Sequence, residues 1–330
     1  RAHWGADFTG KKVRRSYGRW VYDETGRADG VSYNTRPFAD EDGHGTIVAS
    51  IIGGKKSGIA KNAAIIGVRV FDKDGKPPED AVVKGVNYVW RDYVGRLREF
   101  YERTPGSRRL GAEEYTARKL GEIIRMDGAP QAVVNMSLGG VGQDEAAESM
   151  IEAAAEHAGM HFSIAAGNDG VNAAGFTPAR SLTGVGVGAY GTNLARASFS
   201  NYGLEEYVEL YAPGEGMNGA ETGTQRTRRS VDGTSFAAPI VAGVMALYLT
   251  HEKLRPGELR ARLMREAVKN PNGVLVRESS YGTQERTEYG AQGKRNSKMT
   301  YYPRWGVRRY PMNMCTLKPW LDRRMAEMGM

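Results

Sequence analysis

The sequence is poor in cysteine and has no long apolar run. Cys315 is the one cysteine among 330 residues, so no disulfide can form within the chain and its fold must rely on a packed core. No apolar run approaches the roughly 20 residues that a membrane span needs, and no signal-peptide pattern opens the chain. These absences exclude a disulfide-rich scaffold and predict a protein without a membrane span.

Composition and charge distribution narrow the class further. Hydrophobic residues make up 40% of the sequence and charged residues 25%, with 43 glycines, which is typical of a globular enzyme with many tight turns. The formal net charge is +8, and residues 271–330 carry eleven Lys or Arg against five Asp or Glu. The basic character therefore belongs mainly to the C-terminal tail and does not indicate nucleic-acid binding by the rest of the chain.

Apolar β-type runs alternate with helical patterns as far as about residue 270. The predicted strands include 63–70, 131–137 and 162–166, and the predicted helices include 145–157 and 234–249. This alternation predicts the α/β class, with a mostly parallel sheet covered on both faces. Active sites in such sheets lie at the carboxyl ends of the strands. The glycine-rich turns after the second and third predicted strands are therefore candidate site loops.

Three polar segments flanked by glycine carry the chemistry: Asp42–Thr46, Ala165–Gly170 and Asp232–Pro239. A neutral histidine such as His44 can take the proton of a serine hydroxyl near pH 7. Ser235 precedes an apolar helix, where its backbone N–H and the positive end of the helix dipole can face a developing oxyanion. The Asn168 amide, at a strand end, can supply a second oxyanion donor.

Each segment also has a purely structural interpretation. Gly-Thr-Ser before an apolar helix is a common N-cap arrangement. A lone His44 is more often structural, and a lone Asn168 is more often a turn former. Chance explains the three together poorly, so acyl transfer is the favoured chemistry.

Four motifs in chain order carry a resemblance to a known family. They are Gly43-His-Gly-Thr-Ile-Val-Ala49, Ser137-Leu-Gly-Gly140, Ala165-Ala-Gly-Asn168 and Gly233-Thr-Ser-Phe-Ala-Ala-Pro239 with its following helix. The set resembles the subtilases, the subtilisin-like serine peptidases. The resemblance implies a subtilisin-like three-layer α/β fold with a mostly parallel central sheet. It also implies a serine endopeptidase that hydrolyses protein or peptide substrates through an acyl-enzyme.

The resemblance assigns a role to each motif. Ser235 would attack the scissile carbonyl, His44 would take and return the proton, and Asn168 would hold the oxyanion together with the Ser235 N–H. The substrate would be lined by Ser137, Leu138, Gly139 and Gly140 on one side and by Ala165, Ala166 and Gly167 on the other. Ile47 and Ile240 stand where relatives often carry histidine, and both are expected to be packing positions.

The acid of the triad has two candidates. The family places an aspartate at the end of the first core strand, followed by Ser or Thr and then Gly. Asp7, in Asp7-Phe-Thr-Gly10, precedes His44 by 37 positions, a comfortable spacing, but follows only a short strand. Asp23 follows a better strand but precedes His44 by only 21 positions. We favour Asp7, whose replacement by Asn is expected to slow catalysis by leaving His44 in the wrong tautomer.

Cofactor and compartment depend on the resemblance alone. Many relatives carry a calcium-binding loop where this chain has the short, basic segment Gly53–Gly58. Hard cations need several oxygen ligands, so we predict no metal ligands in that segment and leave calcium open as a cofactor at other sites. The resemblance favours a secreted protein.

The predicted domains are a peptidase domain at residues 1–270 and a basic C-terminal extension at 271–330. The long interval between His44 and Asn168 indicates a helical insertion at about 91–125. Basic and aromatic residues interleave in Tyr301–Tyr310, a pattern that can bind nucleic acid or another polyanion. We favour instead an extension wrapped on its own domain.

A rival hypothesis places the function elsewhere on the same fold. In it, the chain is a catalytically impaired binding module that acts through the insertion or the basic tail. The irregular aspartate motif supports that hypothesis. The intact Ser235, His44 and Asn168 favour the active peptidase, because an impaired relative need not keep all three.

Overall fold

The computed structural model describes most of the first 267 residues and two strands beyond them. The described residues are 2–9, 12–16, 19–23, 32–33, 40–267, 284–289 and 295–300, with gaps at 41, 73–74, 76, 78–79, 143, 193, 204–206 and 225–226. The predicted C-terminal extension therefore lies outside the described residues, except for the antiparallel pair β14 (Gln284–Tyr289) and β15 (Arg295–Thr300).

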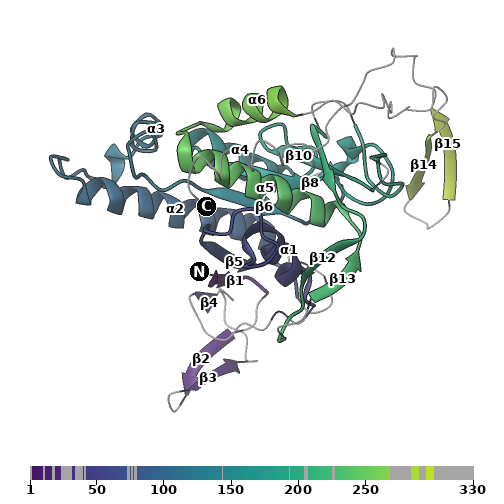
Figure 1. The fold of residues 1–330 in the computed structure, drawn as a ribbon, viewed down its shortest axis with the longest axis horizontal. Coiled ribbons are helices and arrows are strands. Elements are labelled where there is room, and N and C mark those ends of the chain that lie inside the picture. The colour runs from purple at the N-terminus through teal and green to yellow at the C-terminus, as the bar shows by residue number, and fades with distance from the viewer. Residues whose placement is uncertain are drawn as a thin grey trace.

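A four-stranded parallel sheet lies at the centre of the molecule (Figure 1). Its order is β11 (Leu210–Pro213), β10 (Val185–Tyr190), β8 (His161–Ala165) and β6 (Val133–Met136). Every residue of β8 and β10 is buried, which is expected of parallel strands covered on both faces. The strands expected at 131–137 and 162–166 are confirmed, and so is the parallel character of the sheet.

The N-terminal strands form a separate three-stranded sheet. In it, β1 (Ala2–Asp7) pairs parallel with β5 (Ile65–Arg69) and antiparallel with β4 (Ser32–Tyr33). The other described strands form two-stranded ribbons: β2 (Lys12–Ser16) with β3 (Arg19–Asp23), β7 (Gly140–Val141) with β9 (Phe176–Thr177), and β12 (Met217–Ala220) with β13 (Thr227–Val231).

Helices cover the two faces of the central sheet and complete three layers. On one face α1 (His44–Gly53), α5 (Thr234–His251) and α6 (Pro256–Glu266) share a core with β10 and β11. On the other face α2 (Ala81–Arg103), α3 (Ala117–Ile123) and α4 (Glu145–Ala158) share a core with β6 and β8. The neighbours Ile164 and Ala165 lie in opposite cores, as strand alternation requires. The predicted three-layer fold is confirmed.

Helix α5 is the central core helix, and it carries a proline. It is the one described helix long and apolar enough to cross a membrane, but 67% of it is buried inside the protein, as expected of a core helix. Ile47 and Ile240, expected as packing positions, are 2% and 9% exposed and belong to the same core.

Helix α2 is the longest described helix and forms an arm with the segment that follows it. Its 23 residues span about 35 Å at 1.5 Å per residue, and Figure 1 shows it extending beyond the sheet. The segment 91–125, expected to be an insertion, holds the second half of α2, the short 3₁₀ helix η1 (Ala112–Glu114) and α3.

Candidate active site

His44 is the first residue of α1, and two aspartates shape the loop before it. The Asp40 carboxylate accepts hydrogen bonds from the backbone N–H of Gly43 at 2.9 Å and of Thr46 at 2.7 Å. The His44 N–H donates to Asp42 at 3.0 Å. The preceding Gly43 adopts φ 89°, a left-handed conformation that glycine takes without strain. These contacts fix the start of the helix and with it the position of the imidazole.

The electrostatics of the loop suit His44 for the role of a base. Burial lowers the pKa of His44 below its ordinary value, and the negative charges of Asp42 and Asp40 oppose that shift without reversing it. The imidazole is therefore neutral at pH 7 and can accept a proton. Its ring centre lies 5.5 Å from that of Phe236, the residue after Ser235, so the site brings His44 beside the start of α5.

Ser235 is the second residue of α5, and its backbone is held from outside the helix. Pro239 has no N–H, so the Ser235 carbonyl lacks the donor that an α-helix would provide four residues later. The Ser137 hydroxyl, at the end of β6, donates to that carbonyl at 2.7 Å. Asn135 in turn donates from Nδ2 to the Ser137 hydroxyl at 2.9 Å. The nucleophile candidate is thus anchored to the central sheet while its side chain stays partly exposed.

Asn168 follows β8 and meets the first residue of α5. Its Oδ1 accepts from the Thr234 N–H at 2.8 Å and from the Thr234 hydroxyl at 2.9 Å. Those two bonds define which end of the amide faces the helix. The Nδ2 group makes no hydrogen bond within the described part of the chain, and it lies 3.6 Å from the point that a Cβ on Gly233 would occupy. An unengaged donor therefore lies at the N-terminus of α5, next to Ser235.

A second asparagine, which sequence reasoning missed, holds the turn that carries Asn168. Asn201 is fully buried and donates from Nδ2 to the Ala166 carbonyl at 3.0 Å. Its Oδ1 accepts from the N–H of Asp169 at 2.9 Å and of Val171 at 3.1 Å. The only signal for it in the sequence is an asparagine in a polar stretch, and no spacing rule links it to a turn more than thirty residues earlier.

The residues expected to line the substrate fall into exposed and buried sets. Gly139 and Gly140 are exposed, whereas Ser137 and Leu138 are partly buried. Gly140 already pairs with Thr177 in the β7–β9 ribbon, so a further strand could add only along the opposite edge. On the second segment Ala165 and Ala166 are buried, with 5% and 0% exposed, and Gly167 is partly exposed with φ 102°.

No contact among the described residues joins Asp7 to His44. Asp7 ends β1 and is fully buried; its Oδ1 accepts from the Thr9 N–H at 2.8 Å and hydroxyl at 2.6 Å. Its Oδ2 lies 3.9 Å from an Arg69 nitrogen and has no hydrogen-bond partner within the described residues. Asp23 ends β3, opposite Lys12 in the hairpin, and its side chain lies outside what the structure describes.

Within the part of the chain that the structure describes, no three His, Cys, Asp or Glu side chains cluster as a metal site would require. Calcium binding, which the sequence leaves open, stays a prediction.

Comparison with known proteins identifies the class. The subtilase family pattern matches residues 14–290, a range that includes His44, Asn168, Ser235 and Asp23 and begins after Asp7. The chain belongs to the subtilase family.

Named relatives and one solved structure agree with that family. Subtilisin-like protease 5 of Arthroderma benhamiae is 34% identical over 256 residues, covering 78% of this chain and 54% of its own length. Alkaline serine exoprotease A of Vibrio alginolyticus is 35% identical over 236 residues, covering 71% of this chain and 36% of its own. The chain thus spans about a third to a half of the length of these relatives. The crystal structure of a cold-adapted subtilisin-like serine proteinase aligns with a TM-score of 0.59 and 32% identity, covering 82% of this chain and 76% of that one.

Proposed function

We propose that this protein is a serine endopeptidase that hydrolyses internal peptide bonds through an acyl-enzyme on Ser235. The observation that carries the proposal is the meeting of α1, α5 and the turn after β8. There, a neutral His44, a partly exposed Ser235 and the unengaged Nδ2 group of Asn168 surround one helix N-terminus. Membership of the subtilase family supports the same chemistry.

Each group then has a step to perform. The Ser235 hydroxyl attacks the scissile carbonyl while His44 accepts its proton, and the imidazolium returns that proton to the leaving amine. The oxyanion formed in the attack lies against the Asn168 Nδ2 and the Ser235 N–H, with the positive end of the α5 dipole behind them. Water then attacks the acyl-enzyme, again with His44 as the base, and frees Ser235.

The proposal retains Asp7 as the acid that orients His44. Two observations support it: Asp7 ends a strand, and its buried Oδ2 is available to accept a hydrogen bond. A carboxylate bound to the imidazole N–H would hold the tautomer whose other nitrogen faces Ser235. Asp23, which falls inside the matched family range, is the alternative acid.

We propose protein or peptide substrates bound in an extended conformation along Gly139 and Gly140. Both glycines are exposed, and a Cβ at Gly140 would meet nothing within 4 Å, so a substrate backbone can approach closely. Main-chain hydrogen bonds along this edge would provide affinity with little dependence on side chains. Gly167 lies on the second substrate segment, before the Asn168 donor.

A fluorophosphonate probe tests the nucleophile directly. We expect the probe to label wild type, and we expect Ser235→Ala and His44→Ala to abolish labelling. Ser230→Ala, at a neighbouring exposed serine, should label normally and serves as the matched control. Labelling that persists in folded Ser235→Ala would contradict the assignment, and absence of labelling in wild type would favour the rival binding-module hypothesis.

A blocked peptide separates endopeptidase from exopeptidase activity. A peptide with an acetylated N-terminus and an amidated C-terminus offers no free end, so only an enzyme that accepts internal bonds can cleave it in its interior. We expect cleavage products from the middle of such a peptide by mass spectrometry. Products that lack only terminal residues, and only from unblocked peptides, would point to an exopeptidase.

A further inference from the structure

The arm formed by α2, η1 and α3 encloses a groove that the proposed peptidase chemistry does not use. Its volume is about 600 Å³, within the range of about 300–1,000 Å³ that is usual for ligand sites. Trp90, Val94 and Leu120 supply apolar lining, and Arg91, Arg98 and His157 supply polar groups. None of these residues belongs to the proposed active site, so the groove is a separate feature of the fold.

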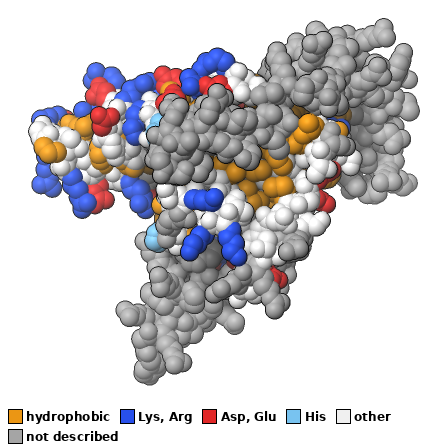
Figure 2. Space-filling view, viewed as in Figure 1, with side chains coloured by type: hydrophobic (Ala, Val, Ile, Leu, Met, Phe, Trp, Pro, Cys, Tyr) orange, Lys and Arg blue, Asp and Glu red, His pale blue; other side chains and the backbone are white. Residues whose placement is uncertain are grey.

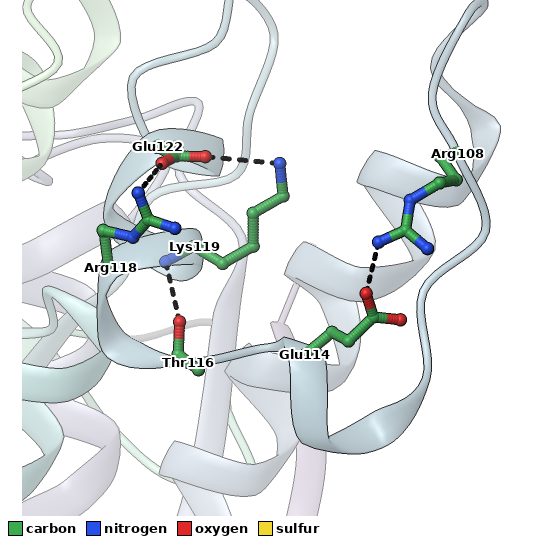
Figure 3. Close-up of polar contacts among 6 residues, drawn as sticks. All are labelled: Arg108, Glu114, Thr116, Arg118, Lys119 and Glu122. Carbon is green, nitrogen blue, oxygen red and sulfur yellow. Dashed lines mark hydrogen bonds and ion pairs between the residues drawn. The ribbon is translucent and has the colours of Figure 1, made fainter.

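The carboxylates of the arm are largely neutralised by their neighbours. The ion pairs are Asp92–Arg96, Glu99–Arg103, Glu114–Arg108, and Glu122 with both Arg118 and Lys119. Figure 3 shows the last two sets: Arg108, in the segment before η1, faces Glu114 on η1, and Arg118 and Lys119 face Glu122 on α3. On the face seen in Figure 2, blue and red side chains are correspondingly interspersed over this arm.

The two arginines of the groove take no part in that pairing. Within the described residues, neither Arg91 nor Arg98 has a carboxylate within 4.0 Å, the distance of an ion pair. The Arg98 guanidinium lies over the Tyr115 ring, 4.7 Å from its centre. The edge of the Trp90 ring meets His157 at 6.1 Å between centres. The groove therefore combines two positive charges that lack an ion-pair partner among the described residues with apolar and aromatic surface.

We propose that this groove binds an acidic segment of a partner protein that also carries an aromatic or long aliphatic side chain. Two carboxylates of the partner would pair with Arg91 and Arg98, in the bidentate geometry that guanidinium groups favour. The apolar side chain would lie on Trp90, Val94 and Leu120, which removes apolar surface from water. Charge complementarity therefore specifies the partner, and the apolar lining provides much of the affinity.

Charge also argues against other occupants. The tail of this chain, residues 271–330, carries a net charge of +6, so it does not complement the two arginines. A nucleic acid backbone is bound by a track of many cations, whereas Arg96, Arg103 and Lys119 of the arm are already paired with carboxylates. An acidic peptide needs only two free cations and an apolar contact.

Gly95 provides a variant that blocks the groove without changing its charge. It lies on α2 in the groove lining, and a Cβ added there would meet nothing within 4 Å. A leucine is also a better helix former than glycine, so Gly95→Leu should fold while its side chain occupies the space. The double variant Arg91→Glu and Arg98→Glu removes the complementary charge instead.

The experiment measures fluorescence anisotropy with the full chain carrying Ser235→Ala, which prevents cleavage of the probe. The probe is a fluorescein-labelled ten-residue peptide of Glu residues with two central Phe residues. We expect saturable binding that falls at least about tenfold in Gly95→Leu and in the double Arg-to-Glu variant. The matched control reverses Arg103 and Arg118, which lie on the same arm outside the groove and pair with Glu99 and Glu122.

Each outcome decides the proposal. Equal loss in the control variant would show a general charge effect and would overturn it, as would unchanged binding in Gly95→Leu. Peptides in which Lys replaces Glu, or Ser replaces Phe, should bind at least about tenfold more weakly. Tighter binding of a labelled single-stranded oligonucleotide than of the acidic peptide would overturn the assignment to a protein partner.

Discussion

Replacing Asn201 by alanine tests whether a buried residue positions Asn168, the proposed oxyanion donor. The change removes one donated and two accepted hydrogen bonds from the turn between Ala166 and Val171. At about 1 kcal/mol for each bond, we expect the free energy of unfolding to fall by about 2–3 kcal/mol. The turn then loses the side-chain contacts on both sides of Asn168 and keeps backbone hydrogen bonds, such as that from the Asn201 N–H to the Gly167 carbonyl.

The decrease in kcat in Asn201→Ala should be smaller than the decrease caused by removing an oxyanion donor altogether. Loss of one oxyanion donor lowers kcat by about 10²–10³, so a donor that is present but poorly placed should cost roughly ten- to a hundredfold. Asn201→Asp keeps the acceptor for the N–H groups of Asp169 and Val171 but cannot donate to the Ala166 carbonyl. Its kcat should therefore lie between wild type and Asn201→Ala.

The assay is steady-state cleavage of a blocked chromogenic peptide, with urea unfolding measured on the same samples. We expect kcat to fall far more than KM changes, because the donor acts mainly on the transition state. A double-mutant cycle with Asn168→Ala isolates the route. If Asn201 acts through Asn168, its substitution should cost almost nothing more in that background. A full additional loss of kcat there, or an unchanged kcat in folded Asn201→Ala, would refute the reasoning.

The other predictions concern charge. Asp7→Asn should lower kcat by about 10⁴-fold if Asp7 orients the imidazole, while Asp23→Asn should leave kcat unchanged. The reverse result would assign the role of triad acid to Asp23. If both variants stay active, a different residue must fill that role. Burial holds the pKa of His44 below its ordinary value, so the midpoint of the acid limb of the kcat/KM profile should lie below pH 6.5. Asp42→Asn removes a negative charge that opposes this shift, so the midpoint should move to a still lower pH in that variant. Burial raises the pKa of Glu209 to about 8 despite the nearby guanidinium on α6. The Glu209 carboxyl therefore binds its proton more tightly in the folded state than in the unfolded chain, and the free energy of unfolding should decline as the pH rises from about 4.5 to 8. In Glu209→Gln, thermal unfolding should show a flatter decline over that pH range.

Local pattern was sufficient to predict the layers of the fold. The strands at 131–137 and 162–166 and the helices at 145–157 and 234–249 were recognisable because each buries a face whose period is visible in the sequence. The separate sheet of β1, β4 and β5 was not foreseen. Which strands share hydrogen bonds depends on tertiary packing, and the sequence does not encode that in any short window.

The residues of the candidate site likewise divide into those that the sequence predicts and those that only the fold reveals. His44, Asn168 and Ser235 stand in glycine-flanked motifs whose local geometry, a helix start or a strand end, the sequence predicts. Asn201 acts across more than thirty residues, so only the folded chain reveals it. The distance between Asp7 and His44 likewise depends on how two separate elements are oriented. Spacing along the sequence could therefore favour Asp7 as the acid but could not determine whether its carboxylate contacts His44.

The bond between Ser137 and the Ser235 carbonyl makes the proposed activity a property of the assembled fold. Its two partners lie 98 residues apart, one just after β6 and the other on α5, two elements that pack together in the folded chain. Because Pro239 removes the local donor, a chain that has formed α5 but not docked it on β6 leaves Ser235, the proposed nucleophile, without this support. Premature self-digestion during folding would be disfavoured as a result, since a partly folded molecule would hold the serine but lack the scaffold that positions it.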